Sequence, residues 1–348
     1  MRVLIAKAED MLTERRQQLL RFIVDEYVRT AQPVASGAIV HRYHLPVSSA
    51  TIRNEMARLE DEGYIVQPHT SAGRIPSDRG YRYYVEALMR PQEPPAAVQQ
   101  TIRHQFHQAA GETTEWAHLA ASVLAARLSY VAVVTIPHAD RPRLRQLQLV
   151  SVHDFEVLLI LVLSEARVLQ HVISLDTPIS QDDLNETSAR LNKLFAGRTA
   201  DEIRATQTDF PPFLADVVSA TLNLMQSSDD ESLADAYLEG IRHILREPEF
   251  AEGDDILALL DLLERSNLAK AIPVARASER SITVIIGSEH PQDAMQQCSV
   301  VISRYGGDSG LGGAVSVVGP TRMHYPRVVS MVGYMTSLMD ELLDAYFT

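Results

Sequence analysis

The alternation of apolar and polar positions between residues 36 and 76 predicts two short helices followed by a pair of strands. Ser36 to Tyr43 forms the first helix, with Ser36 as its expected N-cap, and Pro46 ends it because the proline ring cannot continue a helix. A second helix begins at Ser48, whose side-chain oxygen can accept hydrogen bonds from the free amides of the next turn.

The second predicted helix has two chemically different faces. Ile52, Met56 and Leu59 recur at helical spacing and predict a buried stripe. The opposite face is small, polar and basic, and carries Ala50, Arg53, Asn54, Ala57 and Arg58. Small residues let a helix approach the floor of a DNA major groove, where forked Arg and Asn side chains can read base edges. Since the acidic residues 60–62 would repel phosphate, we expect the N-terminal half of the helix to enter the groove.

The segment after this helix predicts a β-wing. Gly63 is a candidate C-cap, Tyr64 to Val66 is a short strand, and Arg74 with Ile75 is its expected partner across the loop 67–73. The polar or basic wing residues suited to phosphate or minor-groove contacts are His69, Thr70, Ser71 and Arg74. An amphipathic helix with two arginines is by itself usually a solvated surface, but helix, turn, capped helix and wing in this order indicate DNA binding.

The remainder of the chain alternates between strand and helix patterns. A helical stretch after Gly80 is broken by the prolines of residues 91–95, the clearest linker in the sequence. Helical spacing returns at 115–128, and four strand patterns with short turns, at 130–136, 144–150, 155–163 and 168–175, predict an antiparallel meander. Residues 181–270 have helical spacing, strands are expected at 281–286, 300–305 and 314–318, and a last helix at 327–346. This order predicts an α+β domain interrupted by an insertion.

Composition and charge are consistent with this division. The chain has 348 residues, 46% of them hydrophobic, and a net charge of −13. Residues 1–90 hold 13 Lys and Arg against 11 Asp and Glu, whereas the rest hold 19 against 34. The acidic excess therefore lies outside the predicted DNA-reading unit, and we expect DNA binding to depend less steeply on salt than in a uniformly basic protein.

Compartment and membrane signals point to a soluble cytoplasmic protein with no membrane contact. The single cysteine, Cys298, excludes an intrachain disulfide, is expected to fill the core and favours a reducing compartment. The most apolar run, Val157 to Leu163, is far shorter than the ~20 residues that cross a bilayer. The apolar stretch at the N-terminus is too brief for a signal-peptide core.

Candidate catalytic and metal-binding patterns are weak. Residues 307–310 match the tetrad around the nucleophile of chymotrypsin-like proteases, but a glycine-rich turn explains them better in an α+β body. Gly310, Gly312 and Gly313 lack the strand-then-helix order of a dinucleotide fingerprint. His41 and His44 have a spacing that metals accept, yet no further ligands complete a site. We therefore predict no enzyme, no cofactor and no metal.

Five segments stand out together: LPVSSATIRNEMARLEDEGYI, PHTSAGRIPSDRGYRYYV, LNKLFAG at 191–197, PEF at 248–250 and GPTRMHYPRV at 319–328. In combination they resemble the heat-inducible transcription repressor HrcA family of bacteria. The resemblance covers nearly the whole chain. It implies a winged helix-turn-helix at 1–90, a Pro-rich linker at 91–100, and a GAF-like domain at 101–165 and 236–348. An inserted dimerisation domain is expected at 166–235.

The resemblance also implies a function. It predicts a homodimeric repressor that binds a double-stranded inverted-repeat operator of CIRCE type upstream of chaperone operons. Heat releases this repressor because a GroEL-type chaperonin is diverted to damaged proteins. The residues that match the family's recognition helix are Ser48, Ser49, Thr51, Arg53, Asn54 and Arg58, and those that match its wing are His69, Thr70, Ser71 and Arg74. The alternative is a regulator whose GAF-like domain senses a small effector.

Overall fold

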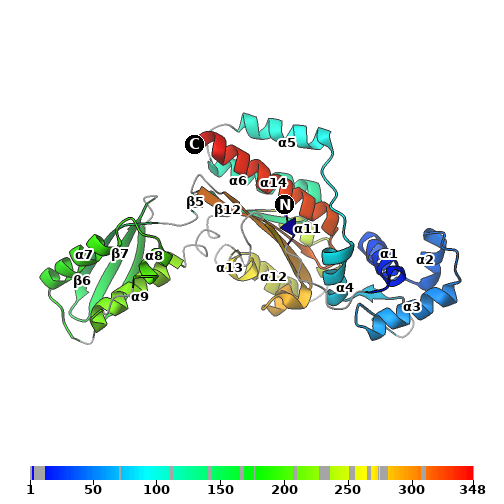
Figure 1. Ribbon diagram of the computed structural model, residues 1–348, viewed down its shortest axis with the longest axis horizontal. Coiled ribbons are helices and arrows are strands. Elements are labelled where there is room, and N and C mark those ends of the chain that lie inside the picture. Colours follow the sequence, from blue (N-terminus) through cyan, green and yellow to red (C-terminus); the bar gives the residue numbers. More distant parts are fainter. Residues whose placement is uncertain are drawn as a thin grey trace. The chain divides into compact units, whose positions relative to one another are not determined.

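The computed structural model mixes helices and sheets in two compact units (Figure 1). Unit 1 comprises Met1–Ile136, Ala234–Tyr305 and Gly313–Thr348, and unit 2 comprises Pro137–Leu233 with Gly306–Gly312. The structure describes residues 2–3, 12–69, 72–109, 113–139, 143–164, 168–175, 177–206, 210–226, 236–250, 255–264, 268–272, 274, 281–306 and 311–347. The predicted α+β class is confirmed at this level, since the two larger sheets are covered by helices.

Unit 1 begins with a region that we call the head (residues 12–88), built on three helices. These are α1 (Glu14–Thr30), α2 (Ser36–Arg42) and α3 (Ser49–Asp61). Each has an apolar stripe that the others cover. The buried side chains of this core include Leu20, Ile23, Ile39, Ile52, Met56 and Leu59. The boundaries of α2 and α3 agree with the prediction, but the N-cap of α2 is Ala35, so the assignment of Ser36 as cap was wrong.

A small antiparallel sheet completes the packing of the head. Strand β2 (Ile65–Val66) pairs with β3 (Ile75–Pro76), one residue away from the predicted partners. Val34, which precedes α2, adds an isolated bridge to Arg74 through two backbone hydrogen bonds of 2.8 and 2.9 Å. A Cβ atom on Gly73 would lie 2.5 Å from the carbonyl carbon of Val34, so glycine is required for this close approach.

The head ends in α4 (Asp78–Tyr83), which continues as a π-helical turn, η1 (Tyr84–Leu88). The helix was predicted here, but its π-helical end was not. Ser77 caps α4 by accepting from the amide of Gly80 at 3.1 Å. A Cβ atom on Gly80 would lie 2.0 Å from the carbonyl oxygen of Tyr64, so α4 packs directly on the backbone that leads into β2.

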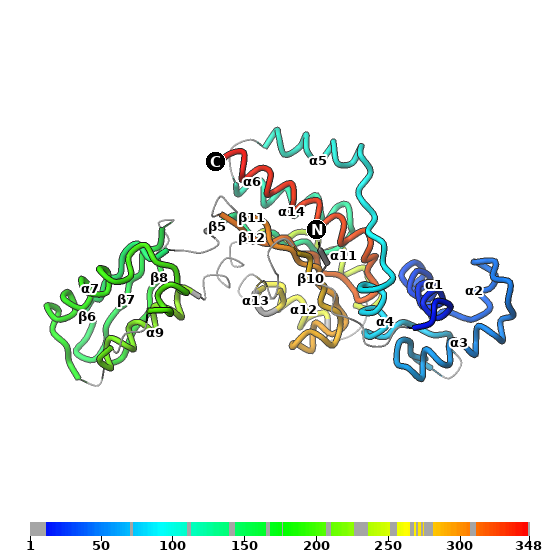
Figure 2. Tube along the Cα trace, viewed as in Figure 1, coloured from blue at the N-terminus to red at the C-terminus, as the bar shows by residue number. Residues whose placement is uncertain are grey.

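The larger sheet of the structure has the strand order β1-β10-β11-β12-β4-β9, which is not the order along the chain. Three of its strands, β10, β11 and β12, are labelled in Figure 2. The strands are β1 (Arg2–Val3), β4 (Val131–Val134), β9 (Tyr237–Glu239), β10 (Ser281–Ile286), β11 (Cys298–Gly306) and β12 (Leu311–Pro320). A short strand, β5 (His138–Ala139), pairs with the start of β12. Strand β4 thus pairs with β12 and β9, and its predicted place in a meander with the following strands was wrong.

Helices pack on this sheet. α6 (Thr113–Leu128) contacts β4 and β9, and α14 (Tyr325–Phe347) contacts α6 and β10. The helix α5 (Ala96–Gln108) was not predicted and lies partly within the expected linker. Shorter helical segments between β9 and β10 are α11 (Ile241–Ile244), η2 (Pro248–Phe250), α12 (Asp255–Leu263) and α13 (Leu268–Ala271). Two more, η4 (Gly287–Glu289) and η5 (Asp293–Met295), follow β10.

Cys298 is buried as expected, and burial raises the pKa of its thiol to about 12.

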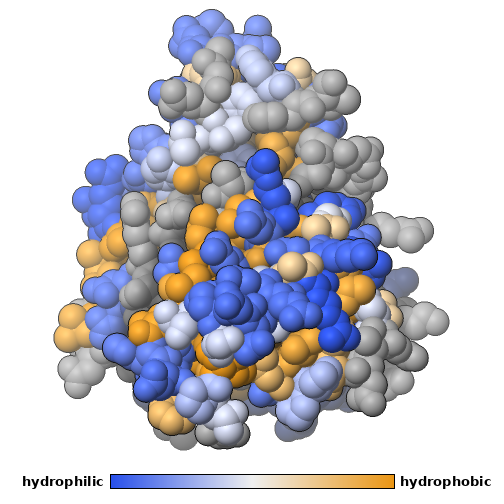
Figure 3. All heavy atoms as spheres, turned by 90° about the vertical axis from the view of Figure 1, so that its left-hand side faces the viewer, coloured by the Kyte–Doolittle hydropathy of each residue, from blue (hydrophilic) through white to orange (hydrophobic). Residues whose placement is uncertain are grey.

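Unit 2 is a three-stranded antiparallel sheet with helices on one face. The predicted meander is confirmed for β6 (Leu144–His153), β7 (Glu156–Leu163) and β8 (Val168–Ser174). Its helices are α7 (Gln181–Phe195), α8 (Ala200–Arg204) and α9 (Pro212–Gln226). Alternate strand residues, such as Leu159 and Leu161, pack with Leu191 and Val217 of the helices in one buried core. Hydrophobic residues also appear at the molecular surface, interspersed with hydrophilic ones (Figure 3).

Candidate nucleic-acid interface

The N-terminus of α3 is organised by a local cap. The Ser48 side chain accepts from the amide of Thr51 at 3.2 Å, and the two hydroxyl oxygens lie 2.9 Å apart. The predicted cap is therefore confirmed, and it begins the helix directly after the turn at Pro46. Ser48, Ser49 and Ala50 are exposed, so the start of α3 presents small side chains to solvent.

The exposed face of α3 carries the predicted base-reading side chains. Arg53, Asn54 and Arg58 are exposed, while the opposite stripe of the helix is buried. Arg58 lies 3.9 Å from Glu55, whereas Arg53 has no ion-pair partner among the described residues. The five N–H donors of an exposed arginine on a helix face can form bidentate hydrogen bonds with guanine or phosphate.

The acidic residues of α3 are partly neutralised by arginines from other elements. Arg16 of α1 donates to Glu55 at 3.2 Å and to Glu62 at 2.5 Å. Arg74, at the start of the wing's second strand, pairs with Glu60. The acidic C-terminal end of α3 thus serves to attach the helix to α1 and to the wing, which periodicity and charge counting did not reveal.

The predicted wing residues separate into two groups. His69 is exposed, and Thr70 and Ser71 lie outside the described residues. Arg74 is only 18% exposed at its side chain, and its Nε and Nη2 atoms are 2.9 and 2.8 Å from Glu60 Oε2. The structure therefore gives Arg74 a positioning contact within the head.

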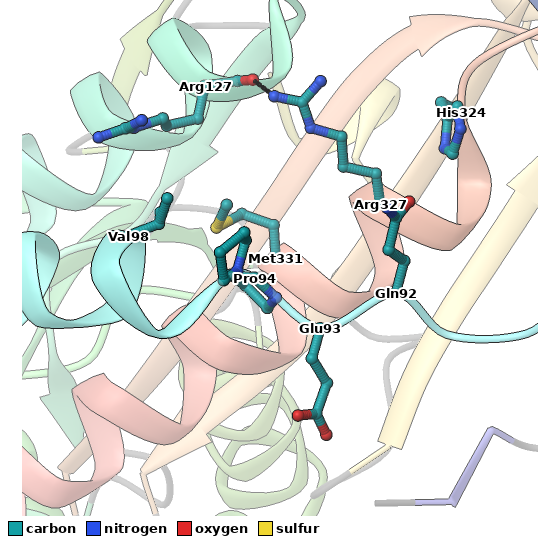
Figure 4. A pocket seen from close by; sticks show the side chains of 9 residues that line it. Gln92, Glu93, Pro94, Val98, Arg127, His324, Arg327 and Met331 are labelled. Atoms are coloured by element: carbon teal, nitrogen blue, oxygen red, sulfur yellow. Dashed lines mark hydrogen bonds between the residues drawn. The ribbon is translucent and has the colours of Figure 1, made fainter.

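Two cavities lie beside the head and the linker. One of about 430 Å³ is formed by the linker with α5, α6 and α14, and includes Pro94, Val98 and Met331 (Figure 4). The Arg327 guanidinium donates to the Arg127 carbonyl at 2.5 Å beside it (Figure 4).

The second cavity, of about 500 Å³, is lined by residues of α1, α2, η1 and the start of α14, and by Tyr130. Asp25 lies on its wall and accepts from the Tyr84 hydroxyl at 3.1 Å. Burial raises the pKa of Asp25 above its ordinary value, which the Tyr84 hydrogen bond and the nearby Arg21 partly offset. His324 borders both cavities.

Two of the family-like motifs are bonded to each other. Arg322 of GPTRM donates to Glu249 of PEF, including a contact of 3.1 Å from Nη2, and also pairs with Glu247. The Arg322 side chain is 11% exposed, so the ion pairs are nearly enclosed. The sequence analysis quoted both motifs without linking them, because nothing in either motif identifies its partner.

Other classes of site are not supported within the described part of the chain. No group of three or more His, Cys, Asp or Glu residues there could hold a metal ion. His41 and His44 are both exposed. None of the described helices has the length and apolarity needed to span a bilayer. The protease-like tetrad at 307–310, which includes Gly310, lies outside the described residues.

Comparison with known proteins identifies the family. A family model described as the HrcA protein C terminal domain matches residues 114–329. The chain is 39% identical over 341 residues to the heat-inducible transcription repressor HrcA of Roseiflexus castenholzii, covering 95% of this chain and 94% of the relative. The chain belongs to the HrcA family. Its relative in Chloroflexus aurantiacus is 40% identical over 357 residues, covering 96% and 95% of the two chains.

Membership of the HrcA family supports a role in heat-inducible transcriptional repression. Family membership does not favour the alternative of a regulator whose GAF-like domain senses a small effector. A solved crystal structure described as a hypothetical protein at 2.2 Å resolution has a TM-score of 0.62 and 24% identity, covering 96% of this chain and 99% of that chain. This likeness supports the fold alone.

Proposed function

We propose that the chain is a homodimeric repressor of chaperone operons that acts in the cytoplasm on a CIRCE-type inverted-repeat operator. In this proposal the head is a winged helix-turn-helix, the larger sheet with α6 and α14 is GAF-like, and unit 2 is the inserted dimerisation domain. Helix α3 enters the major groove with its N-terminal half. The wing contacts the DNA backbone or minor groove through His69 and the neighbouring Thr70 and Ser71.

The observation that carries DNA binding is the exposed polar face of α3. Its first turn is capped and carries only small side chains, and Arg53 and Asn54 follow one turn later on the exposed surface. Small residues near the helix N-terminus permit close approach to the groove floor, and the two longer side chains have donors and acceptors for base edges. Ser49, Thr51 and Arg58 flank them as proposed phosphate or base contacts.

Dimerisation is supported by a largely apolar sheet face in unit 2 that no described helix covers. We call it the unit 2 sheet face; its apolar residues are Val150, Leu158, Ile160, Val162, Val168 and Val172, and Gln146, Gln148 and Gln170 lie among them. Val150 and Val172 flank Leu158 on neighbouring strands, and Val168 flanks Val162. Val168 and Val172 are 52% and 50% exposed, although valine is usually buried.

A second copy of the chain is the occupant that fits this face best. The strands alternate, so their other side chains already pack against α7 and α9. Apolar residues that point away from a complete core are typical of an interface between subunits. Two joined heads would read two half-sites and roughly double the binding free energy of one head. One head alone has too small an interface with DNA to select its site among the competing sites of a genome.

Membership of the HrcA family supports a proposal for regulation by heat. We propose that a GroEL-type chaperonin maintains the active repressor, and that heat-damaged proteins compete for the chaperonin. The active fraction of repressor then falls and the operons are derepressed. No surface of the chain is assigned to the chaperonin.

Footprinting of the purified protein on DNA upstream of a chaperonin operon tests the proposal. We expect protection of an inverted repeat, at lower protein concentration when chaperonin and ATP are present. A matched DNA with one half-site scrambled should lose most of the protection. Absence of a footprint on any chaperone promoter would contradict the proposed operator, and an unchanged footprint with chaperonin would contradict the proposed regulation alone.

A further inference from the structure

Helix α4 and the π-helical turn η1 make polar contacts in two directions. Toward α1, the Tyr83 hydroxyl oxygen accepts from the Leu12 amide at 3.3 Å and from Gln17 Nε2 at 3.1 Å. The Tyr84 hydroxyl donates to Asp25 of the same helix at 3.1 Å. These contacts fasten α4 and η1 to the head.

A second set of contacts from α4 reaches β10 and η4 of the larger sheet region. The Arg82 guanidinium donates to both carboxylate oxygens of Glu289, at 2.8 Å from Nε to Oε1, and to the Val284 carbonyl at 2.7 Å. One turn earlier, Asp78 Oδ2 accepts from the Ser288 amide at 2.8 Å. We call Asp78 and Arg82 with Ser288 and Glu289 the α4 clasp.

The backbone at residue 287 is adapted to the α4 clasp. Gly287 has a φ of +49°, and a Cβ atom there would lie 2.4 to 2.5 Å from the Asp78 carboxylate. Any other residue would strain the backbone and displace Asp78 from the Ser288 amide. The glycine therefore permits the direct contact between α4 and η4.

An aromatic contact accompanies the α4 clasp. Tyr81 is 2% exposed, and its ring lies 5.8 Å from that of Tyr325 at the start of α14. Tyr325 is fully buried, and its hydroxyl lies 2.8 Å from that of Ser299 on β11. Both polar contacts and an aromatic contact thus hold helix α4 against the larger sheet region.

We infer that Arg82 is a positioning residue for operator binding, because the α4 clasp fixes the orientation of the head on the larger sheet region. The Arg82 and Glu289 side chains are 28% and 36% exposed, and ion pairs this accessible contribute little to folding stability. Their bidentate geometry, however, restricts orientation strongly. Loss of the α4 clasp should therefore change which half-site spacings the proposed dimer accepts. This inference rests on the proposed operator.

Arg82→Gln and Glu289→Gln test the inference in the full-length protein. The probes are a duplex with the footprinted inverted repeat, the same duplex with about five base pairs inserted between half-sites, which is half a helical turn, and a single half-site. We expect wild type to lose at least about tenfold in affinity on insertion, whereas the variants should bind the native repeat roughly tenfold more weakly and lose most of this discrimination. Affinity for the single half-site should not change.

A readout without DNA separates the inference from the proposed function. The Ser288 amide should exchange with solvent faster in both variants and in Gly287→Ala, as measured by hydrogen exchange. Arg103→Gln, which breaks the exposed Arg103–Glu341 pair between α5 and α14, is the matched control and should alter neither readout.

The outcomes distinguish the two claims. A wild-type protein that binds no inverted repeat contradicts the proposed function. Hydrogen exchange at the Ser288 amide still reports whether the α4 clasp forms. Folded variants that keep the wild-type spacing discrimination overturn the inference, as does a wild type that binds the repeat without discrimination. If Arg82→Gln does not fold, the measurements on Glu289→Gln and Gly287→Ala decide whether the inference holds.

Discussion

Arg74 and Glu60 join the small sheet of the head to helix α3. The Arg74 guanidinium approaches one carboxylate oxygen of Glu60 through Nε at 2.9 Å and Nη2 at 2.8 Å, while its backbone pairs with Val34. One residue thereby connects α3, the wing and the segment that precedes α2. The orientation of α3 relative to the wing depends on this contact.

Arg74→Ala should lower the free energy of unfolding by about 1 kcal/mol, since the variant lacks the partly buried charge pair with Glu60. Urea denaturation of Arg74→Ala, Glu60→Ala and the double variant measures the coupling of the pair. The exposed Arg53→Ala is the control and should change stability by less than about 0.5 kcal/mol. Equal stability of Arg74→Ala and Arg53→Ala would show that the pair does not support the head.

Gly80→Ala should destabilise the head strongly, because its new methyl group would lie 2.0 Å from the Tyr64 carbonyl oxygen. We expect a loss of about 2 kcal/mol or more, since α4 must move off the wing. Gly37→Ala in α2 is the matched control. Its Cβ would meet no atom within 4 Å, so the protein should be up to about 1 kcal/mol more stable. Thermal unfolding of the two variants compares them, and similar melting temperatures would contradict the packing described for α4.

Asp25→Asn should change the pH dependence of stability. Burial raises the pKa of Asp25 in the folded protein above the ordinary value of 3.8, so the folded state holds this proton more tightly than the unfolded chain. The stabilisation is present below pH 3.8 and is lost as pH rises through the raised pKa, which leaves a destabilising carboxylate at neutral pH.

The asparagine can still accept from Tyr84 but does not ionise. We therefore expect the stability of Asp25→Asn relative to wild type to increase between about pH 4 and pH 7, by less than about 1 kcal/mol because the side chain is partly exposed. Chemical denaturation at several pH values measures this. Asp154→Asn, in an exposed turn between β6 and β7, should show no such gain. A gain that shrinks toward neutral pH would contradict the direction given for Asp25.

Val172→Asp should dissociate the proposed dimer without unfolding unit 2. The residue is 50% exposed in a single copy, so the charge is tolerated there but would be buried against a second copy. Sedimentation equilibrium should show a shift from dimer toward monomer. Val66→Asp, a valine 42% exposed in the head, is the control and should leave the dimer intact. A Val172→Asp dimer as tight as wild type would exclude the unit 2 sheet face as the interface.

Local features of the head could be predicted from sequence, because each depends on residues close together in the chain. The Ser48 cap and the stripe of Ile52, Met56 and Leu59 follow from helical geometry alone. The bridge between Val34 and Arg74 could not be predicted, because its partners are 40 positions apart and neither has a distinctive pattern. The contribution of Arg74 to positioning was missed for the same reason.

Strand order was the least predictable part of the fold. The patterns identified β4 and β10 as strands, but pairing depends on contacts between distant segments that alternation does not encode. Strand β9 has only three half-buried residues, too few for a pattern, and α5 has an apolar stripe limited to Ile102 and Phe106 among its fully buried positions. The exposed residues of α3 were predictable, whereas the arginines that neutralise its acidic end were not.

The most direct test of DNA reading by α3 is the affinity of Arg53→Ala for the footprinted inverted repeat, measured by fluorescence anisotropy beside wild type and Arg103→Gln. Arg53 is exposed and has no ion-pair partner among the described residues, so its replacement should leave thermal unfolding unchanged. Because each half-site then lacks one base-reading guanidinium, we predict binding weaker by on the order of a hundredfold, and undiminished binding by Arg103→Gln. A folded Arg53→Ala protein that binds the repeat as tightly as wild type would contradict the account.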